Sequence, residues 1–275
     1  MSFLQVDIYF KSDYYDFIIG ELYKLNCDSI WEEENYLKAY FDNKLYSQEK
    51  LRYAIQSIAY ESIESFSISQ LKDENWNSKW EEAFSPVRID EICFIYADFH
   101  EKEEGYEQYI KIAPKMAFGT GHHETTFMMI QQMSNIDLEN KKVLDLGCGS
   151  GILSVFAAQN KAAHIDAVDI EKASYDNAEE HKILNKVDYN VFLGGVEIVP
   201  KTTYDIILAN INRKVLLEYK DEIQSLVKKN GTILMSGILE KDHEIIEEKY
   251  TSDFEIEHKT QRGKWLCYKF IKTIA

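Results

Sequence analysis

Hydrophobic and polar residues alternate with two different periods along the 275-residue chain. In the first 72 residues, stretches that alternate at every second position indicate half-buried strands, and stretches with a period near 3.6 indicate helices. In chain order the pattern predicts a strand over residues 3–10, a helix to about residue 26, a hairpin over residues 28–42, a helix opened by Ser47 and a strand over residues 66–71. This order predicts a small ferredoxin-like α+β domain over residues 1–72.

A second region has a different pattern. Residues 73–86 place Trp76, Trp80 and Phe84 at four-residue spacing, which predicts a linker helix. Residues 87–275 then alternate buried strands with helices, as a doubly wound α/β domain does. Seven strands are expected near residues 142–146, 164–169, 189–193, 204–211, 231–237, 254–260 and 265–271. The last two follow each other directly, so the final strand is expected to be antiparallel to its neighbours.

Composition indicates the compartment. Hydrophobic residues make up 45% and aromatic residues 13% of the chain, enough for real cores. The N-terminus has no basic region followed by an apolar run, and no stretch approaches the roughly 18 apolar residues of a membrane span. The four cysteines are scattered without a C-x-x-C pair. A cytoplasmic protein with reduced thiols and no membrane attachment is therefore expected.

The formal net charge of −16 indicates what kind of partner the protein has. Like charge repels a nucleic-acid backbone, so no direct DNA binding is expected. A basic protein would be attracted by the opposite field. The alternative is that the acidity only confers solubility.

A glycine-rich turn carries the most informative chemistry. The predicted strand 142–146 contains Asp145 and runs into Gly147, Gly149 and Gly151 at alternate positions, after which a helix begins. Glycines there allow a sharp turn and let a ligand approach the main chain. The next strand ends in Asp169, where a carboxylate can hold both ribose hydroxyls of a nucleoside. The alternative is an ordinary strand–helix turn that binds nothing.

The details of the turn favour one nucleoside ligand. Ile152 stands where a dinucleotide fingerprint requires its third glycine, and no Gly-Lys-Ser/Thr of a phosphate loop follows. Asp145 would repel a pyrophosphate and favour an ammonium group. S-adenosylmethionine carries an ammonium and a sulfonium but no phosphate, so we expect it as the cofactor.

The strand over residues 204–211 ends in a candidate catalytic residue. Asn210 lies at the carboxyl edge of the predicted sheet, where open α/β sheets bind ligands. Its side-chain carbonyl could accept an N–H of an amine and aim the lone pair at a methyl group. The alternative is a cap for the following helix, a role that Asn212 would serve better.

The loop Ala117–Thr126 is the other unusual element. Glycines on both sides of Thr120 let it bend over a ligand, and Thr125 or Thr126 is expected to cap the next helix. His122, His123 and Glu124 are adjacent in sequence and do not converge on one ion as an H-E-x-x-H helix does, so no metal is expected.

These motifs together resemble the PrmA family, the methyltransferases of ribosomal protein L11. The matching residues are Ala117 to Thr126 (the family's AFGTG-x-H-x-TT), the glycine run from Asp145 to Gly151, Ala209-Asn210-Ile211, the linker residues Trp76 and Trp80, and Ser236–Leu239. Within the loop the chain departs from the commonest pattern at His122 and Glu124. The resemblance implies a seven-stranded class I methyltransferase domain. Residues 1–72 have a foldable pattern, a separate linker and no chemical motif, so we expect them to form a substrate-recognition domain. The resemblance also implies cofactor contacts at Thr126, Gly147, Asp169 and Asn210, beside the candidates Asp145, Gly149 and Gly151, with Phe118, Thr120 and His123 in the loop near the substrate.

The implied reaction moves methyl groups from S-adenosylmethionine to lysine side chains and the α-amine of ribosomal protein L11. A free lysine has a pKa of about 10.4, so only roughly one in a few thousand is neutral at pH 7. The site must desolvate the amine or lower its pKa. Alternatives are a class I methyltransferase acting on another protein or a small-molecule amine, and a binding protein that has lost catalysis.

Overall fold

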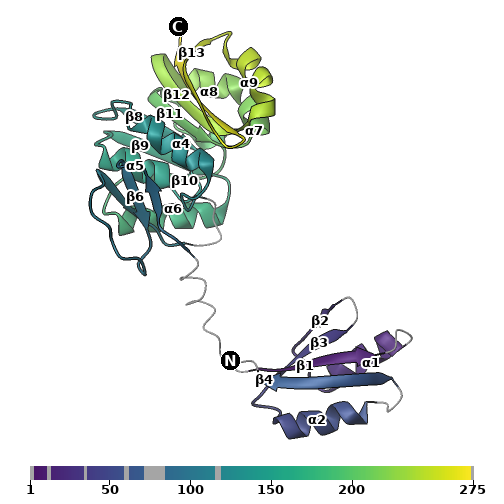
Figure 1. Ribbon diagram of the computed structural model, residues 1–275. Helices are drawn as coiled ribbons and strands as arrows, with labels where there is room; N and C mark the ends of the chain where they lie inside the picture. Colours follow the sequence, from purple (N-terminus) through teal and green to yellow (C-terminus); the bar gives the residue numbers. More distant parts are fainter. Residues whose placement is uncertain are drawn as a thin grey trace. The chain divides into compact units, whose positions relative to one another are not determined.

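The computed structural model describes residues 3–10, 14–33, 36–58, 62–70, 84–114 and 119–273. The chain divides into two compact units, Met1–Ala83 and Phe84–Ala275 (Figure 1). Most of the linker helix expected over residues 73–86, with Trp76 and Trp80, lies outside the described residues, as does Phe118.

Unit 1 is a four-stranded antiparallel sheet in the order β2-β3-β1-β4. Its elements are β1 (Phe3–Phe10), α1 (Tyr15–Lys24), β2 (Ser29–Glu32), β3 (Leu37–Asp42), α2 (Gln48–Ser57) and β4 (Ile63–Gln70). Leu4, Val6 and Ile8 of β1 are buried in one core with residues of both helices. The helices therefore cover one face of the sheet, as the ferredoxin-like order predicts. Ser47 caps α2 by accepting a hydrogen bond from the Lys50 backbone N–H at 3.3 Å.

Unit 2 contains a seven-stranded sheet in the order β10-β9-β8-β11-β12-β14-β13. Its strands are β8 (Lys142–Leu146), β9 (His164–Asp169), β10 (Asn190–Leu193), β11 (Tyr204–Asn210), β12 (Val227–Leu239), β13 (Phe254–Arg262) and β14 (Trp265–Lys272). The first five are parallel, and β14 is antiparallel to both β12 and β13, which confirms the expectation for the final strand. The carboxyl ends of β8 to β12 consequently meet at one edge.

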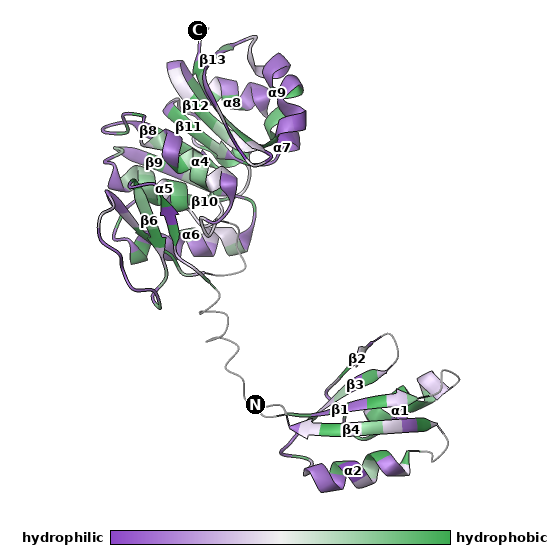
Figure 2. Cartoon of the chain, viewed as in Figure 1, coloured by the Kyte–Doolittle hydropathy of each residue, from purple (hydrophilic) through white to green (hydrophobic). Residues whose placement is uncertain are grey.

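Helices cover both faces of this sheet. One core contains residues of α4 (Glu124–Met133), α5 (Ile152–Gln159) and α6 (Lys172–Leu184), and the other contains residues of α7 (Arg213–Glu218), α8 (Lys220–Leu226) and α9 (His243–Tyr250). Hydrophobic residues gather on the central strands and on α5 (Figure 2). Helix α5 is apolar around most of its surface because a small sheet of β5 (Val87–Ile89), β6 (Cys93–Tyr96) and β7 (Gln108–Lys111) packs in the same core.

A buried carboxylate joins three strands toward their amino ends. Asp166 of β9 accepts hydrogen bonds from Tyr204 Oη at 2.6 Å and Asn190 Nδ2 at 2.9 Å, and His164 Nε2 lies 2.9 Å away. Burial opposes ionisation, but these partners outweigh it and hold the pKa of Asp166 below its usual value. The strands are thereby tied together away from the edge where their carboxyl ends meet.

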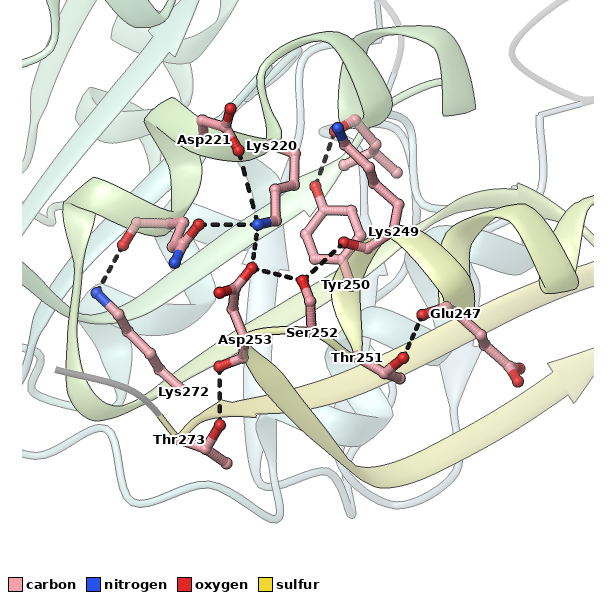
Figure 3. A network of polar contacts seen from close by, with 12 residues as sticks. Lys220, Asp221, Glu247, Lys249, Tyr250, Thr251, Ser252, Asp253, Lys272 and Thr273 are labelled. Carbon is pink, nitrogen blue, oxygen red and sulfur yellow. Dashed lines mark hydrogen bonds and ion pairs between the residues drawn. The ribbon is translucent and has the colours of Figure 1, made fainter.

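Two buried lysines anchor α8 to its neighbours (Figure 3). Lys272 Nζ of β14 donates to the backbone carbonyls of Gln224 and Val227 at 2.8 and 2.9 Å, at the carboxyl end of α8. The helix dipole favours a cation there. Lys220 Nζ contacts the carboxylate of Asp253 and donates to Gln224 Oε1 at 2.8 Å. This network fixes the corner where α7 ends and α8 begins.

No helix in the described part of the chain is long and apolar enough to cross a membrane. All four cysteines are buried and free of disulfide bonds.

Candidate functional site

The glycine-rich turn after β8 is folded tightly against β9. Gly147, Gly149 and Gly151 have φ angles of +70°, +54° and +74°, in the left-handed region that favours glycine. The backbone N–H groups of Gly147 and Cys148 both donate to the carbonyl of Val168, at 2.8 and 3.0 Å. The turn is therefore held to the neighbouring strand by its own main chain.

Asp169 has a structural task that the sequence did not predict. One carboxylate oxygen accepts the Gly149 N–H at 2.8 Å, and the other accepts the Glu171 N–H at 2.9 Å. A carboxylate offers about four acceptor positions, so two remain for a ligand. Asp169 lines the pocket described below, and it can hold the turn and meet ribose hydroxyls at the same time.

Asp145 lies beneath the turn rather than in the pocket. Its side chain is 1% exposed and accepts a hydrogen bond from Ser154 Oγ of α5 at 2.6 Å. Burial raises the pKa of Asp145 to about 7 against the effect of the Ser154 bond, and the charge of Asp169 adds to the rise. Asp145 can influence a bound cation through its field, but it is not among the described lining residues.

A pocket of about 560 Å³ lies at the carboxyl edge of the sheet. Five of the residues predicted from the sequence line it: His123, Gly147, Gly149, Asp169 and Asn210. The remaining wall residues are Thr125, Leu146, Val168, Ile170, Glu171, Ser174, Gly194, Gly195, Val196, Ile211, Asn212, Val215, Glu218, Tyr219, Gly237 and Trp265.

The other described candidates are not among the lining residues. A Cβ on Gly151 would be 2.7 Å from Tyr189 Oη and 3.0 Å from Ala178 Cβ, so this glycine is required for packing of the turn against α6. Thr126 is 1% exposed and lies behind Asn210. Thr120 is not among the described lining residues, and its Oγ1 lies 3.1 Å from His122 Nδ1.

Sequence reasoning missed part of the wall. Ile170 is 75% exposed although it is a large apolar residue, and it directly follows Asp169. Gly194 and Gly195 follow β10 at the same edge as the other strand ends. Both positions could have been found from the sequence. Ile170 directly follows the candidate Asp169, and the two glycines directly follow a predicted strand. Trp265 had no such signal, since only the pairing of β14 with β12 brings it to the pocket.

The loop after residue 118 contacts the glycine-rich turn. Ser150 Oγ donates to the Gly119 carbonyl at 2.6 Å, and a Cβ on Gly119 would lie 2.5 Å from that hydroxyl. His122 Nε2 lies 2.8 Å from the Ser85 carbonyl, which ties the loop to the start of unit 2. Two of the motifs shared with the PrmA family, the loop ending at Thr126 and the glycine run ending at Gly151, are therefore in direct contact.

The prediction that Thr125 or Thr126 caps α4 is wrong. The N-cap is His123, whose Nδ1 accepts the Thr125 N–H at 3.3 Å, and both threonines lie in the first turn. The helix starts earlier because an imidazole nitrogen takes the role that a hydroxyl oxygen usually has. The His123 ring also packs edge-on against Trp265, with ring centroids 4.8 Å apart.

Asn210 and Asn212 have different partners. Asn212 Oδ1 accepts the Val215 N–H at 3.2 Å and caps α7, as predicted. Asn210 Nδ2 points to Thr126 Oγ1 at 3.5 Å. Asn210 is thus available to the pocket and is not the helix cap.

The chain is similar to known proteins over most of its length. The model of the family described as "Ribosomal protein L11 methyltransferase (PrmA)" matches residues 11–273. A ribosomal protein L11 methyltransferase of Phocaeicola vulgatus is 33% identical over 253 residues, covering 90% of each chain. One from Porphyromonas gingivalis is 31% identical over 261 residues, covering 93% of this chain and 90% of the relative.

A solved structure is also similar. A ribosomal protein L11 methylase from Lactobacillus delbrueckii subsp. bulgaricus superposes with a TM-score of 0.65 at 25% identity, covering 70% of this chain and all of that one. The α/β fold expected from the sequence, with its large mixed sheet, agrees with this neighbour.

The buried position of Asp145 predicts a pH-dependent stability. The folded protein binds a proton on Asp145 more tightly than the unfolded chain does, because the pKa of Asp145 is raised to about 7 in the folded state. The protonated carboxyl therefore contributes its full stability below the unfolded pKa. This contribution is lost as the pH rises through about 7. Relative to wild type, Asp145→Asn should therefore gain about 2–3 kcal/mol of unfolding free energy between pH 5 and pH 8. Urea denaturation at both pH values measures the difference.

The control is Asp188→Asn, which changes a side chain that is 94% exposed. Its difference from wild type should stay within about 0.5 kcal/mol over the same range. An Asp145→Asn difference that does not change with pH would contradict the assignment.

Proposed function

The chain belongs to the ribosomal protein L11 methyltransferase (PrmA) family, and from this premise we propose that it transfers methyl groups from S-adenosylmethionine to lysine side chains and the α-amine of ribosomal protein L11. One observation carries the proposal. Asp169 and Asn210, at the carboxyl ends of β9 and β11, line the same pocket, one with a carboxylate for a ribose and the other with an amide for an amine. Because all four thiols are free, we place the reaction in the cytoplasm.

The charge and size of the pocket suit the proposed cofactor. Its described lining contains the carboxylates Asp169, Glu171 and Glu218 but no lysine or arginine, which suits a cation without phosphate groups. Ile170 and Val196 offer apolar surface for an adenine ring beside the ribose acceptor. The volume of the pocket lies within the usual range of about 300–1,000 Å³ for small-molecule sites.

The arrangement around Asn210 suits an amine nucleophile. When bound, S-adenosylmethionine supplies an electrophilic methyl group on its sulfonium. Because Asn210 Nδ2 is directed to Thr126, its Oδ1 is the acceptor that can hold an amine N–H. The rings of Trp265 and His123 form part of the wall and reduce the solvation of an ammonium, which favours the neutral amine. The amine proton leaves to water.

Unit 1 is proposed as the substrate-recognition domain because one face of its sheet carries exposed aromatic residues. Tyr9 is 41% and Trp31 is 64% exposed on the face opposite the helices. Tyr9 stacks on Tyr36 with ring centroids 4.9 Å apart, and Trp31 meets Tyr40 edge-on at 6.3 Å. Ordered aromatic rings bind lysine and arginine side chains through cation–π contacts. A basic ribosomal protein is a suitable partner for such a face.

The decisive test is incubation of purified ribosomal protein L11 with this protein and S-adenosylmethionine, followed by mass spectrometry. Whole-methyl increments on lysine and N-terminal peptides are expected. A reaction with small-molecule amines but not with L11 would instead favour the alternative activity.

Asp169→Ala should weaken S-adenosylmethionine binding. The substitution removes a charge-assisted acceptor worth roughly 1.5–3 kcal/mol, which corresponds to an affinity loss of about ten- to a hundredfold. Calorimetry measures the loss, and Asp188→Ala, outside the pocket, should bind as wild type does. Unchanged affinity of a folded Asp169→Ala protein would refute the ribose role.

Asn210→Ala and Asn212→Ala should separate catalysis from folding. Loss of the positioning acceptor at Asn210 should lower the methylation rate by about 10²-fold or more, with little change in melting temperature. Loss of the α7 cap at Asn212 should instead cost about 0.5–2 kcal/mol of stability. Rate assays and thermal denaturation are read together. An Asn210→Ala protein with a lowered melting temperature but a normal methylation rate would show that Asn210 is structural and not catalytic.

Trp31→Ala should weaken recognition of the protein substrate. We expect the KM for L11 to rise about tenfold while kcat and cofactor affinity stay near wild type, since the change removes one aromatic contact of an interface. The control is Tyr53→Ala on α2, which removes a side chain that is 74% exposed outside the sheet face. Equal KM values for both variants and wild type would exclude the sheet face as the docking surface.

A further inference from the structure

Ile211, the residue after Asn210, is enclosed by the main chains of two other segments. A Cβ on Gly147, in the turn after β8, would lie 2.2 Å from Ile211 Cγ2. A Cβ on Gly237, in β12, would lie 2.2 Å from the Ile211 carbonyl oxygen and 2.8 Å from its carbonyl carbon. Neither space could be occupied by a side chain while Ile211 keeps its place.

Gly237 owes its position to a bulge in β12. Met235 pairs with Tyr268 and Ile238 with Leu266, so Ser236 and Gly237 stand opposite one residue of β14. Ser236 is fully buried and its Oγ donates to the Leu266 carbonyl at 2.7 Å, which anchors the bulge. Gly237 has a φ of +85°, which places its backbone beside the Ile211 peptide.

Gly147 belongs to the cofactor side of the pocket. Its N–H is bound to Val168 of β9, and the next glycine of the turn is bound to Asp169. Ile211 therefore touches a turn that is fixed to the proposed ribose acceptor, while its own chain carries Asn210. Gly147, Asn210, Ile211 and Gly237 all line the pocket.

We propose that Ile211 and Gly237 are positioning residues for methyl transfer. Ile211, held between Gly147 and Gly237, sets the spacing between the cofactor turn and Asn210. Methyl transfer is an in-line displacement, in which misplacement of the amine by about 1 Å can cost about 10²-fold in rate. The proposal rests on the proposed function for the role of Asn210, but the contact itself is independent of it.

The first test is a set of double variants read by S-adenosylmethionine binding. Gly147→Ala should weaken binding about tenfold or more, because the new Cβ displaces Ile211 or the turn. Ile211→Leu removes the β-branch methyl, Cγ2, that the new Cβ would meet, whereas Ile211→Val keeps it. Adding Ile211→Leu to Gly147→Ala should restore affinity by about threefold or more, and adding Ile211→Val should restore none. Equal effects of Leu and Val would overturn the proposed contact.

The second test compares two glycines whose φ angles both lie in the positive region. Gly105 has a φ of +105° and nothing within 4 Å of a built Cβ, so Gly105→Ala carries the backbone cost without a collision. At saturating substrates, Gly237→Ala should lower kcat about tenfold or more and leave cofactor affinity within about threefold, while Gly105→Ala changes neither. Equal kcat values for the two variants would overturn the positioning role, and so would a kcat loss that only follows a loss of cofactor affinity.

The outcomes separate this inference from the proposed function. A wild-type protein that binds the cofactor but does not methylate L11 would count against the proposed function, while the binding series would still support or overturn the Ile211 contact. If Gly237→Ala does not fold, Ile211→Leu in the wild-type background replaces it. That variant should lower kcat while cofactor affinity stays near wild type, and an unchanged kcat would overturn the role.

Discussion

The site depends on main-chain segments that lie closer together than side chains would allow. At Gly147 and Gly237 the space of a Cβ is taken by Ile211, and at Gly119 it is taken by the hydroxyl of Ser150. Hydrogen bonds to Val168 and Asp169 hold the glycine-rich turn in this arrangement. The glycines therefore serve two purposes. They expose backbone to a ligand, and they let three strand ends form one continuous pocket wall.

Two buried aspartates show how differently the opposite ends of the sheet are built. Asp166 has partners in Tyr204, Asn190 and His164, and its pKa is held below the usual value. Asp145 has only the Ser154 hydroxyl as a described side-chain donor, and burial raises its pKa to about 7. The amino ends are therefore joined by a satisfied charge, whereas the edge that lines the pocket holds a carboxyl that a bound cation would help to ionise.

The sequence predicted features that local patterns determine. The bounds of β8 and β9 follow from short apolar runs between polar residues, and Asn212 caps α7 because the capping pattern is local. The wrong cap of α4 and the features that were not foreseen depend on tertiary contacts. His123 replaces a threonine as the cap of α4, Asp145 turns away from the pocket toward Ser154, and Trp265 reaches the pocket only because β14 inserts beside β12. The role of Gly237 likewise required the register of β12 and β14.

Charge and catalysis place opposite demands on this protein. A net charge of −16 accelerates the approach of a basic protein, yet acidic surroundings also keep a lysine protonated and so unable to attack a methyl group. In the proposed reaction, an amide at position 210 would resolve this conflict at the reacting nitrogen. A carboxylate there would stabilise the ammonium, whereas the neutral amide can align an N–H without favouring the charged form. In the proposed reaction the acidity is therefore useful for capture over long distances, and the uncharged pair of Asn210 and Thr126 orients the amine.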